Sequence, residues 1–509
     1  MLSVLNTLFI NGIEAQPVKV EVDIQNGLPD FQIVGLASMA IKEARERVRS
    51  AIKNCDYQFP NQKIIVNLAP ADLKKEGTHF DLAIALGILI ASEQVKAAED
   101  QLFYLAGELS LDGSVREVPG ILPMALELIN LPHPVQFIIP TGNAPEAALV
   151  SEQTALPVHH LTQVIHWVEG EISLEKAVAD VSLSQANLSP GDFTEVKGQE
   201  TAKRAMQIAA AGMHNLLLIG PPGGGKTMLA RRAVSIFPDM NRQEVLESTR
   251  IYSVANLLNK DQPLIHIRPF RAPHKNASSA SIVGGGRIPR PGEISLAQNG
   301  ILFLDELPEF NRDVLEALRQ PLEDKVITVA RAQGTYTFPA NFILIASMNP
   351  CPCGNYGSQL ECRCTPMQIQ KYLNRISGPL LDRMDLHVEV PRVNFEQLRN
   401  HDPGETSAQI KERVTNARAL QEARFADRSY KVNALMTPSD IKRHCILNHE
   451  TEQLLKSAFQ KLSLSARGYN RILKVARTIA DLENEPAIQI QHIAEALQYR
   501  SLDKKYWMA

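Results

Sequence analysis

Long hydrophobic runs are missing from this 509-residue sequence. The longest uncharged apolar run, Leu82 to Ala91, has about half the length that a helix needs to cross a bilayer, and it indicates a buried helix. The N-terminus also lacks the basic start, apolar run and small-residue cleavage site of a secretory signal. We therefore expect a cytoplasmic protein with no membrane partner.

Cysteine is scarce and neither sign of charge dominates. The chain has six cysteines, and because structural disulfides are rare in the reducing cytoplasm, a cysteine cluster there indicates a metal site or tight turns. The formal net charge of −3 gives no overall signal for nucleic acid. Any such binding must therefore come from a local basic segment.

The length is too great for one hydrophobic core, which predicts roughly three domains. Residues 1–170 mix predicted strands with predicted helices, among them 38–53, and indicate one α/β domain. Residues 171–194 are rich in Ser, Asp, Gly and Pro, as in a linker. In residues 195–391 helices alternate with short β-branched runs, which predicts a three-layer α/β domain with a parallel sheet. Residues 392–509 are predicted to be all-helical.

The strongest motif follows an apolar strand and precedes a helix. Its glycines allow main-chain NH groups to surround a phosphate, its lysine places a charge on the β and γ phosphates, and its threonine hydroxyl can bind Mg²⁺. The motif consists of Gly220, Pro221, Pro222, Gly223, Gly224, Gly225, Lys226 and Thr227. It predicts a site for ATP and Mg²⁺.

Two further apolar strands end in polar residues suited to this site. Asp305 and Glu306 follow the run Ile301 to Leu304, so Asp305 can hold the Mg²⁺ while Glu306 takes a proton from the attacking water. Asn349 closes the next strand, and its amide can orient the water or sense the γ phosphate. Acids at a helix start and a polar turn residue are the ordinary alternatives, but the order of the motifs favours the catalytic roles.

Four arginines are candidates for contacts to nucleotide. Arg383 lies between two acids, either in a surface salt bridge or as an arginine finger reaching a neighbour's ATP, and Arg375 competes for the second role. Arg467 and Arg471 are one helical turn apart and can face one ligand.

A basic segment, residues 268–292, contains no acid and predicts a local contact to DNA. A second insertion, 325–342, reads as a hairpin with Tyr336 and Phe338 available for stacking or for core packing. Solvated loop charges and core aromatics are the alternatives. The DNA-binding candidates are Arg271, Lys275, Arg287, Arg290 and Arg331.

Four of the six cysteines lie together just beyond Asn349. Two Cys-x-Cys pairs can supply four thiolates to tetrahedral Zn²⁺, which is the favoured interpretation, with reduced thiols in tight turns or redox chemistry as alternatives. This cysteine cluster consists of Cys351, Cys353, Cys362 and Cys364. Cys55 and Cys445 lie elsewhere and are expected to act as small apolar residues.

These motifs, in this order, resemble the ComM/YifB family of magnesium-chelatase-like AAA+ ATPases. The residues that carry the resemblance are 26–52, 66–89, 268–274, 290–310, 375–391 and 464–483. The resemblance implies a P-loop AAA+ three-layer domain, an N-terminal Lon-protease-like domain and a C-terminal helical lid. It implies a hexameric ring in which Arg383 is the finger supplied in trans and Arg467 is the second sensor.

The resemblance to the Lon protease domain does not extend to its catalytic residues. His79 stands where proteolytic relatives have the serine, and Leu122 lies near the place of their lysine. Ser-Lys peptide hydrolysis is therefore not expected, and a DNA-binding or assembly role is favoured for this domain.

The leading hypothesis is an ATP-dependent DNA translocase that promotes branch migration of recombination intermediates, as in integration of DNA during natural transformation. Its expected partners are branched, single- or double-stranded DNA and a recombinase or the DNA-uptake machinery. The alternatives are a chelatase-type ATPase that remodels a protein partner and a nucleotide-gated DNA-binding scaffold. Stimulation of hydrolysis by DNA discriminates the first hypothesis from the second.

Overall fold

The computed structural model describes most of the chain and divides it into two compact units. The described residues are 1–71, 74–97, 102–150, 154–178, 191–258, 263–286, 289–331, 334–358, 360–393, 404–461 and 464–507. The N-terminal unit comprises Met1–Ala186, Arg242–Ile265 and Thr328–Thr337, and the P-loop unit comprises Asn187–Asn241, His266–Ile327 and Phe338–Ala509. The boundaries of the three predicted domains remain a prediction.

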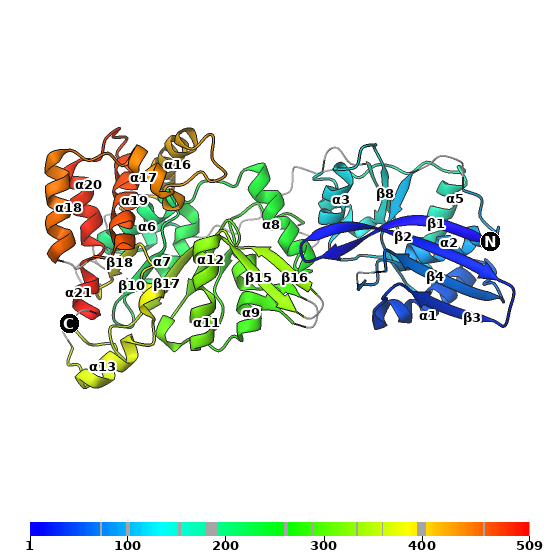
Figure 1. Cartoon of the computed structure of the whole chain (residues 1–509), viewed down its shortest axis with the longest axis horizontal. Coiled ribbons are helices and arrows are strands. Elements are labelled where there is room, and N and C mark those ends of the chain that lie inside the picture. Colours follow the sequence, from blue (N-terminus) through cyan, green and yellow to red (C-terminus); the bar gives the residue numbers. More distant parts are fainter. Residues whose placement is uncertain are drawn as a thin grey trace. The chain divides into compact units, whose positions relative to one another are not determined.

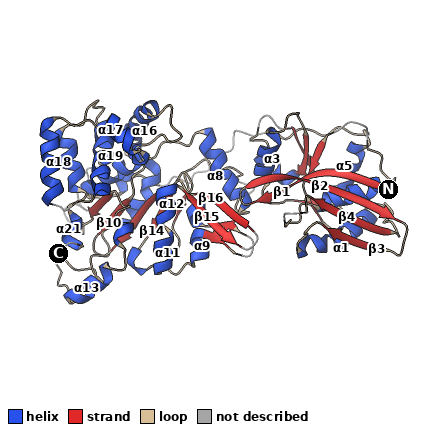
Figure 2. Cartoon of the chain, in the orientation of Figure 1, coloured by secondary structure: helices blue, strands red, loops and turns tan. Residues whose placement is uncertain are grey.

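A seven-stranded mixed sheet forms the N-terminal unit (Figure 2). Its order is β3 (Asp30–Val34), β4 (Lys63–Ala69), β2 (Glu14–Gln25), β1 (Leu2–Asn11), β5 (Phe103–Leu105), β8 (Gln136–Pro140) and β9 (Thr154–Val158). The strand β2 pairs antiparallel with both β1 and β4, and the other neighbours run parallel. Buried and exposed residues alternate along β2, as expected for a strand with one face on a core.

Helices cover this sheet in a way that follows from their apolar patterns. Helix α1 (Met39–Asn54) is amphipathic and buries one face, including Ile41 and Val48. Helix α2 (Asp81–Ala91) is buried almost all round and packs on β1, β2 and α1, which confirms the predicted buried helix. The remaining elements of the main N-terminal segment are β6 (Glu108–Leu109), β7 (Val115–Arg116), α3 (Ile121–Ile129), α4 (Ala144–Ala147) and α5 (Leu161–Val168).

Two segments from the middle of the sequence group with the N-terminal unit. Helix α8 (Arg242–Val254), green in Figure 1, packs against α3. Ser253 Oγ of α8 donates a 2.7 Å hydrogen bond to Glu146 Oε2 and accepts one of 3.2 Å from the backbone NH of Gly120. The second segment belongs to the hairpin of β15 (Val326–Arg331) and β16 (Gly334–Pro339), within which Tyr336 approaches Gly12. Phe338, which follows in the P-loop unit, is fully buried.

His79 and Leu122 are buried, at 4% and 0% exposure. Burial lowers the pKa of His79 to about 4, so its ring is neutral near pH 7. Neither side chain is exposed at the surface. The lack of Ser-Lys peptide hydrolysis in this unit stays a prediction.

A five-stranded parallel sheet forms the centre of the P-loop unit. Its order is β11 (Phe270–Arg271), β14 (Ile301–Leu304), β17 (Ile343–Met348), β10 (Leu216–Ile219) and β18 (Leu386–Glu389). Every residue of β10, β14 and β17 is buried, as expected for a sheet covered on both faces. The connecting helices include α6 (Glu200–Gly212), α7 (Lys226–Arg232), α9 (Ser279–Val283), α10 (Glu293–Leu296), α11 (Arg312–Ala317), α12 (Arg319–Asp324), α13 (Pro366–Leu373) and α14 (Gly378–Leu381).

The C-terminal part of this unit is helical (Figure 1). Its helices are α16 (Ser407–Arg424), α17 (Pro438–His444), α18 (His449–Lys461), α19 (Ala466–Leu482), α20 (Ile490–Gln498) and α21 (Leu502–Tyr506). Capping boxes at Thr406 and Thr437 begin α16 and α17. The mixed α/β class, the parallel sheet and the helical C-terminal region are thereby confirmed. In the described part of the chain no helix combines the length and apolarity that a bilayer span requires.

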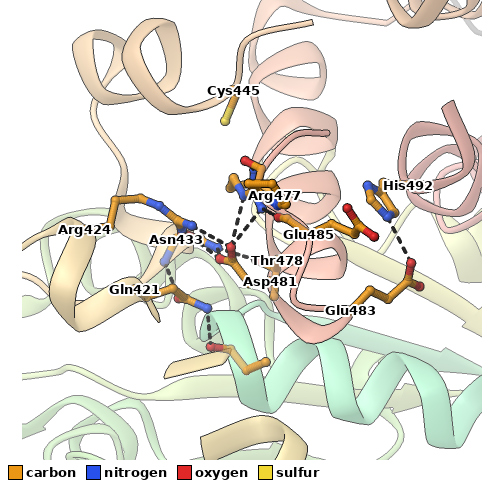
Figure 3. Close-up of polar contacts among 12 residues, drawn as sticks. Gln421, Arg424, Asn433, Cys445, Arg477, Thr478, Asp481, Glu483, Glu485 and His492 are labelled. Atoms are coloured by element: carbon orange, nitrogen blue, oxygen red, sulfur yellow. Dashed lines mark hydrogen bonds and ion pairs between the residues drawn. The ribbon is translucent and has the colours of Figure 1, made fainter. Parts of the chain in front are cut away.

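A buried polar network holds these helices together (Figure 3). The fully buried carboxylate of Asp481 in α19 accepts hydrogen bonds from Arg424 of α16 at 2.7 Å, from Arg477 at 3.1 Å and from Asn433 at 2.8 Å. Gln421 extends the network to α6 by donating to the carbonyl of Ala211 at 3.1 Å. Both arginines therefore depend on one carboxylate for their counter-charge.

We expect Asp481→Ala to lower the free energy of unfolding by about 3–5 kcal/mol, because it leaves two largely buried cations without their counter-charge. Urea-induced unfolding followed by circular dichroism measures the change. Asp427→Ala, at an exposed position of the same region, is the control and should change stability by about 0.5 kcal/mol or less. Equal effects of the two substitutions would contradict the role given to Asp481.

Candidate functional site

The glycine-rich loop runs from β10 into α7, and its backbone geometry explains two of its glycines. At Gly220 a Cβ atom would lie 2.0 Å from the carbonyl oxygen of Val390, so no larger residue fits there. Gly225 has φ of 85°, a left-handed conformation that favours glycine, and it is the last residue before α7. The loop can therefore turn sharply at the N-terminus of a helix, where main-chain NH groups favour an anion.

The side chain of Lys226 is held at the glycine-rich loop, where a phosphate would bind. Its ammonium donates hydrogen bonds to the carbonyls of Gly220 and Pro221 at 2.7 and 2.9 Å, and to Asn349 Oδ1 at 3.2 Å. Burial lowers its pKa, although the carboxylates of Asp305 and Glu306 oppose this shift. An incoming phosphate would supply the negative charge that this buried ammonium now lacks.

Thr227 and Asp305 meet at the position that suits a magnesium ion. Thr227 Oγ1 donates a 2.9 Å hydrogen bond to Asp305 Oδ2, and Ser347 Oγ bonds the other carboxylate oxygen. A hydroxyl and a carboxylate are ligands that Mg²⁺ accepts. The donor set therefore fits the ion that the sequence predicts.

Glu306 has the left-handed conformation, with φ of 56°, directly after Asp305. Lys275, a member of the predicted DNA-binding segment, donates a 2.6 Å hydrogen bond to Glu306 Oε2. This contact raises the pKa of Lys275. The candidate base is thus held by a cation of the basic segment.

Sequence reasoning placed Lys275 and Glu306 in separate roles and missed this contact, because they are far apart in sequence and no spacing rule joins them. It also missed Ser347, whose only signal is its position two residues before Asn349. Gln199 is a third omission: its amide donates to the carbonyls of Gly224 at 3.2 Å and Pro391 at 2.6 Å.

The other basic residues of the segment are distributed differently. Arg271 forms two hydrogen bonds with Glu293, at 2.7 and 2.8 Å, and Arg290 is exposed on β13 (Arg290–Pro291), which pairs with β12 (Gly284–Gly285). Arg287 and the side chain of Arg331 lie outside the described residues.

Arg383 and Arg467 lie together, away from the glycine-rich loop of their own chain. Both form ion pairs with Glu323, that of Arg467 at 3.8 Å. In the parallel pair of β10 and β18, Leu216 lies opposite Leu386. Arg383 precedes the start of β18 whereas the loop follows the end of β10, so they occupy opposite edges of the sheet. The competing candidate Arg375 pairs with Glu309 at 3.1 Å.

These two arginines line a cavity of about 280 Å³ with other charged groups. Arg471 is mostly buried and contacts Asp385 at 3.5 Å. Although burial opposes it, Arg471 and His214 hold the pKa of Asp385 well below its usual range. Arg471 is therefore engaged within the chain, whereas the side chain of Arg467 is 62% exposed.

The cysteine cluster has the geometry of a metal site. The sulfur of Cys351 lies 3.4 Å from that of Cys353 and 3.7 Å from that of Cys362, and all four sulfurs are within 4.8 Å of one another. Backbone NH groups of Asn355 and Arg363 help to lower the pKa of Cys353 to about 6, which favours a thiolate. The remaining cysteines, Cys55 and Cys445, are buried.

Three family models match successive parts of the chain. They are described as "Subunit ChlI of Mg-chelatase" over residues 20–143, "Magnesium chelatase, subunit ChlI" over residues 192–398 and "Magnesium chelatase, subunit ChlI C-terminal" over residues 404–500.

Individual relatives cover nearly the whole chain. The competence protein ComM of Haemophilus influenzae is 48% identical over 499 residues, which are 96% of each chain. The protein YifB of Salmonella typhimurium is 47% identical over 504 residues, 99% of this chain and 98% of its own. A more distant relative is the Holliday junction branch migration complex subunit RuvB of Mycoplasmopsis pulmonis, 23% identical over 60% of this chain and 84% of its own.

The partly buried Lys325, which lines this cavity, makes the stability of the protein depend on pH. Burial lowers its pKa to about 8, against about 10.4 for an exposed lysine. Between these values the unfolded chain holds a proton that the folded chain has lost, so stability rises with pH from about 8 to about 10.4. Below pH 8 both forms are protonated, and the cost of burying the charge is fully present.

We therefore expect Lys325→Met to be more stable than the parent near pH 7 and to lose the rise in stability above pH 8. Melting temperatures measured between pH 7 and pH 10.5 test this. Melting curves that keep the same pH dependence in both proteins would show that Lys325 is not the titrating group.

Proposed function

The chain belongs to the ComM/YifB family of magnesium-chelatase-like AAA+ proteins, and we propose that it is an ATP-driven motor that moves branched DNA during recombination. Family membership supports ATP and Mg²⁺ as cofactors and ATP hydrolysis as the reaction. The observation that carries the link to DNA is the hydrogen bond between Lys275 of the basic segment and the candidate base Glu306.

The residues of the loop and strand ends divide the chemistry between them. Main-chain NH groups of the glycine-rich loop and Lys226 would hold the β and γ phosphates, and Thr227 with Asp305 would hold Mg²⁺. Glu306 would take a proton from the attacking water, which Asn349 would orient. Bound Mg²⁺ supplies neutralisation of the charge that develops on the phosphate oxygens.

The hydrogen bond between Lys275 and Glu306 would allow bound DNA to control the proposed base directly. While Lys275 bonds Glu306, the carboxylate is neutralised and turned toward a cation, so it is a poor proton acceptor for water. A DNA phosphate that competes for Lys275 would release the carboxylate. Hydrolysis would then be faster when DNA lies along residues 268–292.

The positions of Arg383 and Arg467 favour a ring. Both lie at the edge of the sheet opposite the loop of their own chain, so a neighbouring copy's nucleotide is the one within their reach. An arginine supplied in this way can contribute 10³ to 10⁵ in rate. We therefore assign Arg383 as the finger in trans and Arg467 as the second sensor, in a hexamer of this chain.

The names of the relatives guide the choice of DNA substrate. ComM is named as a competence protein and RuvB as a subunit of a Holliday junction branch migration complex, which supports branch migration during uptake and integration of DNA in the cytoplasm. A recombinase or the DNA-uptake machinery would be the partner. The family models, all named for magnesium chelatase, favour a second candidate, an ATPase that remodels a protein.

We also propose that the cysteine cluster binds zinc. A tetrahedral site with Zn–S bonds of about 2.3 Å requires sulfurs about 3.8 Å apart, close to the spacings observed. The cluster begins two residues after Asn349, and a Cβ atom at Gly354 would lie 2.4 Å from Pro222 of the glycine-rich loop. The bound metal would therefore brace both Asn349 and the loop.

We expect Lys275→Ala to raise the basal rate of ATP hydrolysis severalfold and to reduce the further stimulation by DNA, because Glu306 is no longer held. Hydrolysis is measured with and without a synthetic four-way junction, whose strand exchange is followed in parallel. Glu306→Gln should abolish both hydrolysis and strand exchange.

Lys411→Ala is the matched control, because it also removes a lysine with a 2.6 Å carboxylate contact, to Asp239, outside the site. It should leave the basal rate and the stimulation unchanged. If no DNA tested changes the rate of ATP hydrolysis by the parent protein, the motor proposal is refuted and the remodelling ATPase is favoured. If the Lys275→Ala protein behaves as the parent does, only the proposed coupling between DNA and Glu306 is refuted, and the motor proposal stands.

The zinc proposal predicts about one zinc ion per purified chain by elemental analysis. Substituting Cys353 and Cys362 together by serine should remove the metal and lower both the melting temperature and the affinity for ATP. Cys445→Ala, at a buried cysteine outside the cluster, should keep the full zinc content. A chain that contains no zinc and is insensitive to chelators would contradict the proposal.

A further inference from the structure

A groove of about 450 Å³ on the N-terminal unit is lined by residues of α1, of the start of β3 and of the segment that precedes β4. Figure 1 shows where these three elements lie. None of the residues assigned above to ATP, zinc or DNA belongs to it. It is lined by residues 29–31, by 59–62 and by four positions of α1, namely Arg45, Glu46, Arg49 and Lys53.

The exposed face of α1 carries a row of cations. Lys42, Arg45, Arg49 and Lys53 are separated by three, four and four residues, so they lie along one side of the helix, and all are exposed. The row spans about 16 Å at 1.5 Å per residue, enough for several phosphates of an extended strand. The opposite side of α1 is buried in the core, so the cations face solvent.

The charge of the groove is not uniform, because Asp30 and Glu46 also line it. Asp30 accepts a 2.7 Å hydrogen bond from the side-chain amide of Gln32. Three cations (Arg45, Arg49 and Lys53) against these two acids leave the lining with a formal charge of +1. Lys42 extends the positive row beyond the groove.

Two half-buried aromatic rings form part of the same groove. The ring centroids of Phe31 and Phe59 are 5.8 Å apart, and the guanidinium of Arg49 lies 5.7 Å from the centroid of Phe59. Cations interleaved with aromatic faces are what proteins use to hold single-stranded nucleic acid, with phosphates on the cations and bases on the rings.

We propose that this groove binds one strand of unpaired polynucleotide, with its phosphates along Arg45, Arg49 and Lys53 and a base against Phe59. The inference rests on the proposed DNA function but assigns a separate site to it. A duplex would reach the cations without offering a base face to the rings. An acidic protein segment would likewise use only the cations.

The test measures binding of a labelled oligothymidylate to the full-length protein by fluorescence anisotropy over a range of salt concentrations. We expect Arg45→Ala combined with Arg49→Ala to weaken binding about tenfold and to reduce the slope of log affinity against log salt by about 1.4, at about 0.7 per phosphate contact. Phe59→Leu should weaken binding about fivefold with no change of slope, because it removes stacking and keeps the apolar contact.

The matched control is Lys96→Ala combined with Arg116→Ala, two exposed cations of the same unit outside the groove. It should bind as the parent does, and melting temperatures verify that all variants fold. Unchanged affinity and slope in both groove variants would overturn the inference while leaving the motor intact. Polyglutamate serves as a probe for an acidic protein segment. Groove variants that lose affinity for polyglutamate but keep their affinity for oligothymidylate would also overturn the inference. A parent protein that binds no DNA would overturn the proposed function as well.

Discussion

Thr227 of α7 donates a hydrogen bond to Asp305, and this contact links the helix that follows β10 to the end of β14. Lys226, the first residue of α7, makes the equivalent connection to Asn349, which follows β17. All three strands are parallel and buried, so their carboxyl ends meet at one edge of the sheet. Because the sheet is covered on both faces, its strands cannot shift independently, and the polar residues that follow them are held in mutual reach.

The same arrangement of strands separates Arg383 and Arg467 from the glycine-rich loop of their own chain. Arg383 precedes β18 and therefore lies at the amino end of the sheet, where it shares Glu323 with Arg467. In the proposed ring, these arginines would complete the nucleotide site of a neighbouring copy of the chain. The basic segment differs, because Lys275 reaches Glu306 within one chain. In the proposed mechanism, a DNA phosphate and the candidate base Glu306 would compete for Lys275.

Binding of DNA in two places would suit a protein that handles branched substrates. The basic segment belongs to the P-loop unit and would follow the state of the nucleotide, whereas the groove on α1 belongs to the N-terminal unit. The cysteine cluster would make the nucleotide site more rigid, because the turn at Gly354 packs on Pro222 of the glycine-rich loop.

The order of apolar strands and polar ends along the chain was enough to predict the parallel sheet and the placement of the glycine-rich loop, Asp305, Glu306 and Asn349 at the ends of strands, since these motifs are local. The helical C-terminal region followed equally from periodicity. The pairing of Lys275 with Glu306, the shared use of Glu323, the grouping of α8 with the N-terminal unit and the groove beneath α1 could not be predicted. Each depends on side chains that are distant in sequence, and their approach is decided by how sheets and helices pack in three dimensions.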